Sequence, residues 1–258
     1  MSDSPILVTK ALTKEFKGFV AVSNVNLSVQ RGHIHALIGP NGAGKTTCFN
    51  LLTKFLEPTE GQILFNGIDI TAEKPAQIAR RGIIRSFQIS AVFPQMTVLH
   101  NVRIGLQRQL GTSYFFWRSD ASLNQLNDQA MALLAEVDLT NFAQSLAVNL
   151  PYGRKRALEI ATTLAMNPEL MLLDEPTQGM GHEDVERVTQ LIKKVSAGRT
   201  ILMVEHNMNV IASIADTITV LQRGAVLAEG SYNEVSKNPL VMEAYMGTAD
   251  GVLTGAHA

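Results

Sequence analysis

A glycine-rich segment with one lysine and two threonines follows an apolar run at residues 34–38. It reads Gly39-Pro40-Asn41-Gly42-Ala43-Gly44-Lys45-Thr46-Thr47. Its glycines permit a tight turn whose N–H groups point inward, and a helix that starts there presents its positive end to the same anion. Lys45 would neutralise phosphate charge, and Thr46 offers a hydroxyl to Mg²⁺. A simple strand-to-helix turn needs neither residue, so the pattern predicts a nucleotide-phosphate cradle.

Two carboxylates follow a second apolar run, at residues 170–173. In α/β sheets, functional groups lie at the carboxyl ends of the strands. Asp174 would support Mg²⁺, and Glu175 would point elsewhere and polarise an attacking water. The alternative is that both acids are merely solvated at a strand end. A complete phosphate cradle in the same chain favours the catalytic interpretation.

His206 follows a third apolar run, at residues 200–204, and its imidazole would contact the γ-phosphate at the same edge of the sheet. A histidine at a strand end is more often structural or exposed. Gln88, within Arg85-Ser86-Phe87-Gln88, could ligate Mg²⁺ and sense the position of the following helical section, whereas an isolated glutamine would count as a loop residue. Both assignments depend on the cradle and the acidic pair.

Short apolar runs alternating with helical patterns predict an α/β fold with a mainly parallel sheet to position these groups. Residues 6–12, 25–29 and 62–70 have strand-like patterns, and residues 217–228 resemble a hairpin that turns at 222–224. All four segments are predicted to form an antiparallel β layer beside the main sheet. Residues 98–163 carry helical patterns and predict an inserted helical subdomain.

Composition limits the class of protein further. The chain has 258 residues, 46% of them hydrophobic, a net charge of −1 and a single cysteine. It contains no apolar run long enough to span a bilayer and no secretion signal at its start, so a soluble chain in a reducing compartment is expected. Cys48 is expected to be buried and inert on the helix after the cradle. The near-neutral charge argues against a nucleic-acid partner.

The cradle, Gln88, Asp174, Glu175 and His206, in this order and spacing, resemble the ATP-binding subunit of ABC transporters. The resemblance implies ATP and Mg²⁺ as cofactors and a P-loop NTPase core in a single domain at residues 5–247, with a disordered tail at 248–258. It also implies that an aromatic residue near the N-terminus stacks on adenine. Phe16 has that place, with Val22 beside it and Phe19 less favoured; alternatively, Phe16 belongs to the core of the antiparallel layer.

The signature motif of that family differs here. The matching residues are Leu150-Pro151-Tyr152-Gly153-Arg154, so Pro151 replaces a serine and removes a backbone donor. Proline suits the first position of a helix, and the N–H groups of Tyr152 and Gly153 would still face the phosphate held by a partner subunit. Arg154 adds a cation nearby. A second departure is Gln178-Gly179-Met180-Gly181, which lacks the family's aspartate at the dimer contact.

These departures, with the segments at 87–98 and 238–247, resemble the branched-chain amino acid uptake branch. That branch implies a peripheral subunit on the cytoplasmic face of the inner membrane. Its partners would be a second ATP-binding subunit, identical or different, two membrane-spanning permease subunits and an extracytoplasmic solute-binding protein. The aromatic cluster Tyr114-Phe115-Phe116-Trp117 is either an interface with those subunits or part of the core. Competing functions are an ABC-type ATPase acting on DNA or the ribosome, and a nucleotide binder without hydrolysis.

Overall fold

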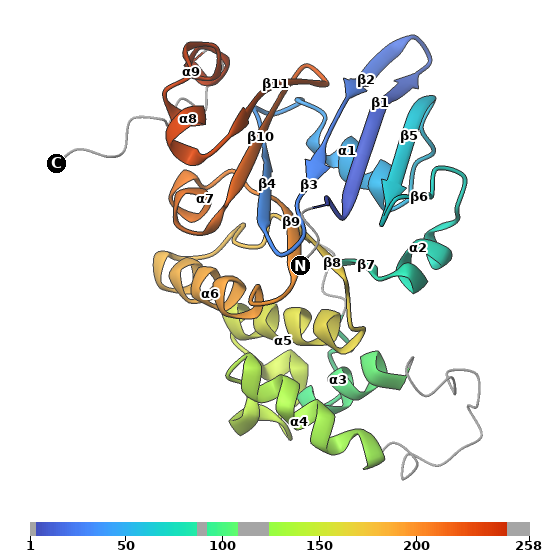
Figure 1. Cartoon of the computed structure of the whole chain (residues 1–258). Coiled ribbons are helices and arrows are strands. Elements are labelled where there is room, and N and C mark those ends of the chain that lie inside the picture. Colours follow the sequence, from blue (N-terminus) through green and yellow to red (C-terminus); the bar gives the residue numbers. More distant parts are fainter. Residues whose placement is uncertain (1–3, 87–91, 108–123, 247–258) are drawn as a thin grey trace, which may run out of the picture.

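Two sheets pack on either side of helix α1 (Lys45–Leu52), and further helices cover the opposite face of the larger sheet (Figure 1). The structure is a computed structural model that describes residues 4–86, 92–107 and 124–246. Buried residues of α1, among them Cys48 and Phe49, contact both sheets. Complete burial raises the pKa of the Cys48 thiol to about 12. The prediction of a buried, unreactive cysteine on this helix is therefore confirmed.

The larger sheet is mainly parallel, as predicted. Its six strands lie in the order β11-β10-β4-β9-β8-β7, and every neighbouring pair is parallel except β10–β11. Along β9, Leu202 and Val204 face α1, whereas Ile201 and Met203 face the outer helices. Both faces are thus buried, which explains the continuous apolar runs in the sequence. The strands are β4 (Ile34–Ile38), β7 (Ile83–Ser86), β8 (Leu170–Asp174), β9 (Thr200–Val204), β10 (Thr217–Gln222) and β11 (Ala225–Gly230).

The hairpin predicted at residues 217–228 is confirmed, but its predicted place in the antiparallel layer is wrong. Strand β10 pairs in parallel with β4 in the main sheet, and only its partner β11 is antiparallel. A local pattern reveals the turn between two strands. It contains no information about which distant strand completes the ladder.

The smaller sheet is antiparallel and confirms the layer predicted from residues 6–12, 25–29 and 62–70. Its main path is β2-β1-β5-β6, and β3 also pairs with β1. Strand β1 extends farther than predicted, to Phe16, where it meets Phe19 of β2 across a tight turn. The strands are β1 (Leu7–Phe16), β2 (Phe19–Val25), β3 (Ser28–Val29), β5 (Glu60–Phe65) and β6 (Ile68–Asp69).

Three helices, α3, α4 and α5, pack together below the larger sheet in the view of Figure 1. The described part of the predicted insert is therefore helical. Helix α5 runs past residue 163 and also contacts β7, so this helix belongs to both the insert and the core. The helices are α2 (Pro75–Arg81), α3 (Val98–Gln107), α4 (Asn127–Glu136), α5 (Tyr152–Ala165), α6 (His182–Val195), α7 (Met208–Ile214), α8 (Tyr232–Ser236) and α9 (Pro239–Met246), with 3₁₀ turns at Thr140–Phe142 and Ala147–Asn149.

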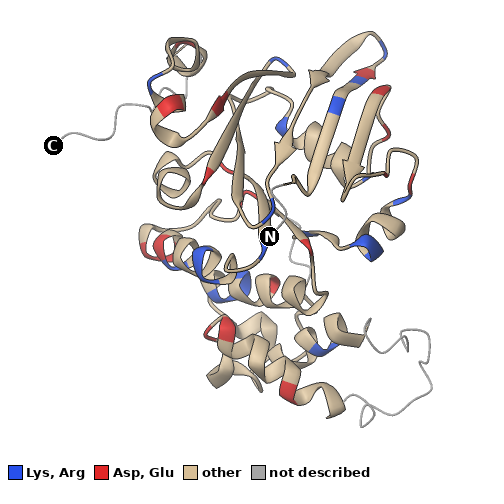
Figure 2. Ribbon diagram, viewed as in Figure 1, with Lys and Arg blue, Asp and Glu red and all other residues tan. Residues whose placement is uncertain are grey.

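Basic and acidic residues are interspersed along the described ribbon, as Figure 2 shows. Helix α6 illustrates this mixture: its first turn carries Glu183 and Asp184, and its last turn carries Lys193 and Lys194. This arrangement complements the helix dipole at both ends. None of the helices described is long and apolar enough to cross a bilayer.

Candidate active site

Three neighbouring parallel strands bring the predicted chemical groups to one edge of the sheet. In the ladder, Leu37 of β4 pairs with Val204 of β9, and Val204 pairs with Asp174 of β8. The cradle begins two residues after Leu37, and His206 lies two residues after Val204. Because parallel strands end in the same direction, the cradle, His206 and the acidic pair are adjacent at this edge.

The cradle is held tightly against neighbouring backbone. A Cβ on Gly39 would lie 2.2 Å from the Leu221 carbonyl oxygen of β10, and one on Gly44 would lie 2.5 Å from the Ala21 carbonyl oxygen of β2. Gly44 also has a φ of 100°. Only glycine fits these two positions. The Gly224 N–H, in the β10–β11 turn, donates to the Ala43 carbonyl at 3.0 Å, so the hairpin pins the middle of the cradle as well.

A contact from the C-terminal helix was not predicted from the sequence. The Gly39 backbone hydrogen-bonds the Tyr245 hydroxyl of α9. Burial raises the pKa of Tyr245 to about 12, and the bond to Gly39 opposes this rise. A bond that lowers the pKa stabilises the charged phenolate, so the Gly39 N–H is the donor and the Tyr245 oxygen the acceptor. A cavity of about 460 Å³ separates the rest of α9 from residues 40–43 of the cradle.

Lys45 points back into the cradle. Its Nζ donates to the carbonyl oxygens of Gly39 at 2.6 Å and Pro40 at 3.0 Å. Burial lowers the pKa of Lys45, and the nearby Glu175 carboxylate opposes this shift. The electrostatic interaction between Lys45 and Glu175 indicates that β4 and β8 bring the cradle lysine and the second acid to a common site.

Asp174 ends β8 as a buried carboxylate. Its Oδ2 forms an ion pair with Arg85 at the end of β7, and its main-chain carbonyl accepts a bond of 3.2 Å from Arg156 of α5. Arg85 also donates to Asn50 of α1 at 2.6 Å. These contacts tie Asp174 to α5 and β7 and, through Arg85, to α1, so the carboxylate has a defined position at the end of β8.

The donors near the cradle fit a magnesium ion carried by nucleotide phosphates. Thr46, in the first turn of α1, offers an exposed hydroxyl, and Asp174 offers a carboxylate. In the described ranges, this edge of the sheet included, no group of three or more His, Cys, Asp or Glu side chains could hold a metal on its own. Magnesium commonly takes one or two protein oxygens and completes its shell with water and phosphate. Thr46 and Asp174 have the ligand chemistry of such a pair, and their role in holding Mg²⁺ stays a prediction.

Glu175 has an unusual backbone conformation. Its φ is 45°, in the left-handed region that non-glycine residues rarely adopt. Two hydrogen bonds maintain it: the Glu175 N–H donates to the Val204 carbonyl at 2.9 Å, and the Gln178 N–H donates to the Glu175 carbonyl at 3.1 Å. Such conformations cluster at functional sites because the surroundings must hold them in place.

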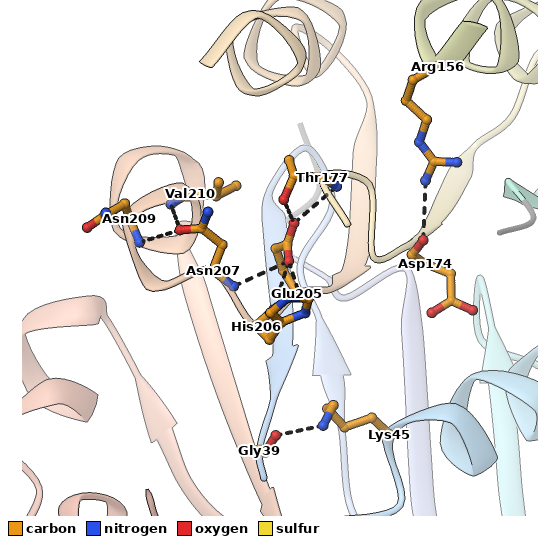
Figure 3. A network of polar contacts seen from close by, with 10 residues as sticks. All are labelled: Gly39, Lys45, Arg156, Asp174, Thr177, Glu205, His206, Asn207, Asn209 and Val210. Atoms are coloured by element: carbon orange, nitrogen blue, oxygen red, sulfur yellow. Dashed lines mark hydrogen bonds and ion pairs between the residues drawn. The ribbon is translucent and has the colours of Figure 1, made fainter. Parts of the chain in front are cut away.

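His206 lies at the same edge with 58% of its side chain exposed. The residue before it, Glu205, is completely buried and was not predicted as part of the site. The sequence does show that Glu205 directly follows a fully apolar strand, which could have indicated a buried carboxylate. It does not show which residues would hydrogen-bond that carboxylate and so make its burial possible. Figure 3 shows Glu205 between the loops that follow β8 and β9.

The two candidate adenine-binding aromatics lie at the tip of the β1–β2 hairpin. Phe16 is 41% exposed and Phe19 is 67% exposed, so the alternative of Phe16 as a core residue is wrong. The Lys14 Nζ lies 5.2 Å from the centre of the Phe16 ring. Val22 was expected beside the base, but it has no exposed surface and packs beneath Gly44. In this structure Val22 supports the cradle instead of offering a surface to a ligand.

The altered signature forms the start of α5. Pro151 is the N-cap and not the predicted first helical residue, so the helix begins at Tyr152. Tyr152 is 59% exposed, and its hydroxyl donates to the Gln178 carbonyl at 3.3 Å, which links the signature to the loop after Glu175. The Arg154 guanidinium lies 4.0 Å from the centre of the Phe142 ring, so it contacts the helical layer.

Gly153 is buried against the first turn of α6. A Cβ at this position would lie 2.5 Å from Asp184 Oδ1. Any larger residue at position 153 would therefore disturb the packing of α5 against α6. Gln88, the aromatic cluster Tyr114–Trp117 and the tail predicted at 248–258 lie outside the described residues.

Comparisons with known proteins give two family matches. Residues 22–178 match the family described as ABC transporter, and residues 225–251 match the branched-chain amino acid ATP-binding cassette transporter family. The chain is 39% identical to the high-affinity branched-chain amino acid transport ATP-binding protein BraF of Pseudomonas aeruginosa, over 95% of this chain and 99% of that protein.

Two solved structures extend the comparison. The ADP conformation of the ATP-binding cassette MJ1267 has a TM-score of 0.83 and 30% identity, covering 95% of this chain and 99% of that one. A dimeric post-hydrolysis state of the cassette MJ0796, bound to ADP and Pi, has a TM-score of 0.72 and 28% identity, covering 88% and 98%.

Proposed function

This chain belongs to the ABC transporter family as an ATP-binding, ATP-hydrolysing cassette, and we propose that it energises the uptake of branched-chain or other hydrophobic amino acids. The similarity to BraF over nearly the full length of both chains carries this proposal. The separate match at residues 225–251 supports it, because that region includes α9 and lies outside the general cassette match. The solute itself would never touch this chain.

The proposed reaction transfers the γ-phosphoryl group of ATP to water, and this chain contributes position and charge. Cradle N–H groups and Lys45 bind the phosphates, while Thr46, Asp174 and Gln88 would hold Mg²⁺, which supplies charge neutralisation when bound. Glu175 would polarise the attacking water, and His206 would hydrogen-bond the γ-phosphate. Phe16 would stack on adenine.

A second ATP-binding subunit would complete the site, with its own Tyr152 and Gly153, or their equivalents, contacting the phosphate held here. The dimeric state of the MJ0796 cassette supports this arrangement. Whether the second subunit is another copy or a related chain, the same N-terminal end of α5 would face the partner. The buried position of Gly153 favours Tyr152 as the more accessible of the two.

Two membrane-spanning permease subunits and an extracytoplasmic solute-binding protein would complete the importer, with this chain bound to the cytoplasmic face of the membrane. An exposed apolar patch supports a protein partner. It comprises Phe93, Met96, Leu146 and Val148, which the Thr97–Leu146 bridge and adjacent backbone hydrogen bonds bring together. Exposed apolar patches of this kind commonly mark interfaces.

Co-purification from detergent-solubilised membranes tests the proposal. We expect the tagged full chain to retain two hydrophobic membrane subunits and to hydrolyse ATP, with the rate rising when solute-loaded binding protein is added to the reconstituted complex. Recovery of ribosomes or DNA in place of membrane subunits would contradict import. A doubly substituted chain, Phe93→Ser with Val148→Ser, should keep nucleotide binding but recover less of the membrane subunits.

A further inference from the structure

The completely buried carboxylate of Glu205 connects the two loops that carry Glu175 and His206. It lies directly after β9, between the loop that follows β8 and the start of α7 (Figure 3). Neither the phosphate contacts nor the metal ligands described above use this side chain. A buried carboxylate needs hydrogen bonds to compensate for its lost hydration, so its partners indicate what it does.

Each oxygen of the Glu205 carboxylate bonds a different loop. Oε1 accepts the Thr177 N–H at 3.2 Å and also the Thr177 hydroxyl. Oε2 accepts the N–H groups of His206 at 2.8 Å and Asn207 at 3.3 Å. One rigid carboxylate thus holds the loop after β8 with one oxygen and the loop after β9 with the other.

Both loops have a second anchor, so the carboxylate fixes them relative to each other. The Asn207 side chain caps α7 by accepting N–H bonds from Asn209 at 3.1 Å and Val210 at 3.4 Å. On the other side, Glu175 precedes Thr177 by two residues and donates its N–H to Val204. The left-handed φ of Glu175 requires such external support.

We propose that Glu205 is a positioning residue for ATP hydrolysis, which holds the water-polarising Glu175 and the phosphate-contacting His206 in one fixed geometry. This inference rests on the proposed roles of those two residues. Glu205 itself touches neither nucleotide nor water in the reaction. Loss of the hydrogen bonds from either carboxylate oxygen leaves the cradle intact but lets Glu175 and His206 move independently. The rate of hydrolysis then falls more than the affinity for ATP.

Glu205→Gln tests this division. The amide keeps one acceptor oxygen and turns the other position into a donor that faces donors, so one loop loses its anchor. We expect kcat for ATP hydrolysis by the full chain to fall about 10- to 100-fold, because misplacement of reacting groups by about 1 Å has effects of that size. The Kd for a fluorescent ATP analogue should stay unchanged.

Thr177 provides a gentler pair of variants. Thr177→Val removes only the hydroxyl that bonds Oε1, whereas Thr177→Ser retains it. We expect Thr177→Val to lower kcat in the same direction as Glu205→Gln, Thr177→Ser to preserve it, and the double variant to be no worse than Glu205→Gln alone. These variants decide the question even if Glu205→Gln fails to fold.

A carboxylate elsewhere serves as the matched control. Asp216 accepts the Ile34 N–H at 2.8 Å at the opposite end of the parallel strands, so Asp216→Asn should alter thermal stability without changing kcat. The inference is overturned if Glu205→Gln and Thr177→Val lower only the melting temperature, or if ATP affinity falls in proportion to kcat. If the wild-type chain binds and hydrolyses no ATP, the proposed function fails and this inference with it.

Discussion

At the scale of single residues, Glu175 combines the features expected of a group held for chemistry. Its backbone is left-handed, its N–H is bonded to the neighbouring strand, and its carboxylate interacts with the cradle lysine. A φ of this kind in a residue other than glycine costs on the order of 1 kcal/mol. The surrounding hydrogen bonds must offset that cost, and they also fix where the carboxylate points.

Glu175→Gln should therefore separate binding from hydrolysis. The amide preserves shape but is too weak a base to polarise water, and general-base contributions are commonly about 100-fold or more. We expect ATP affinity close to that of the wild type and a fall in kcat of at least that order, measured by phosphate release alongside fluorescent nucleotide titration. Turnover near the wild-type rate would remove Glu175 from this role.

At the scale of secondary-structure elements, the cradle depends on segments far from it in sequence. Strand β10 packs its Leu221 carbonyl against Gly39, the β10–β11 turn bonds Ala43, and Tyr245 of α9 accepts the Gly39 N–H. Residues after 220 thus shape a phosphate site at 39–47. Of these contacts, the one from Tyr245 lies within the segment at 225–251 that matches the branched-chain transporter family, so that segment contacts the first residue of the cradle.

Tyr245→Phe tests the contribution of α9. Removal of the hydroxyl leaves the Gly39 N–H without its acceptor, and a lost hydrogen bond of this kind costs about 1 kcal/mol. We expect ATP affinity to weaken about five-fold, since about 1 kcal/mol corresponds to that ratio, with kcat at saturating ATP nearly unchanged. Tyr232→Phe, on the neighbouring helix α8, is the matched control, and an equal effect there would mean that the change is not specific to the cradle.

At the scale of the whole molecule, the site built by one chain is incomplete under the proposed mechanism. The cradle and the start of α5 lie on the same chain, yet Tyr152 bonds Gln178 and Gly153 packs on Asp184. Under that mechanism, the signature of this chain would serve the phosphate of a second subunit. ATP would act between the two cassettes and hold them together until hydrolysis.

We expect Mg²⁺ and ATP to convert the Glu175→Gln chain to dimers, because that variant should bind ATP but hydrolyse it very slowly. Light scattering during size-exclusion chromatography measures the change, and removal of Mg²⁺ with a chelator should reverse it. Lys45→Ala, which lacks the phosphate-binding cation, is the control and should stay monomeric. If Glu175→Gln also stays monomeric with ATP, then either this chain pairs only with a different subunit, or bound nucleotide does not drive its pairing.

The sequence by itself determined the chemical groups and the local elements that carry them. An apolar run precedes the cradle, the acidic pair Asp174 and Glu175, and His206. In the structure these runs form β4, β8 and β9, and each strand ends at or just before the chemical group that follows it. This information is local: strand and helix periodicities and the residue types of a phosphate turn are contained within a few neighbouring positions.

Only the tertiary structure decided which distant segments meet. In the structure β10 belongs to the parallel sheet, and Val22 is buried beneath the cradle. Phe16 lies at the surface, and Tyr245 contacts Gly39. Glu205, an isolated acid in the sequence, hydrogen-bonds both the loop after β8 and the loop after β9. These outcomes depend on packing between residues far apart in the chain, where burial and hydrogen-bond satisfaction choose among partners that local patterns leave equivalent.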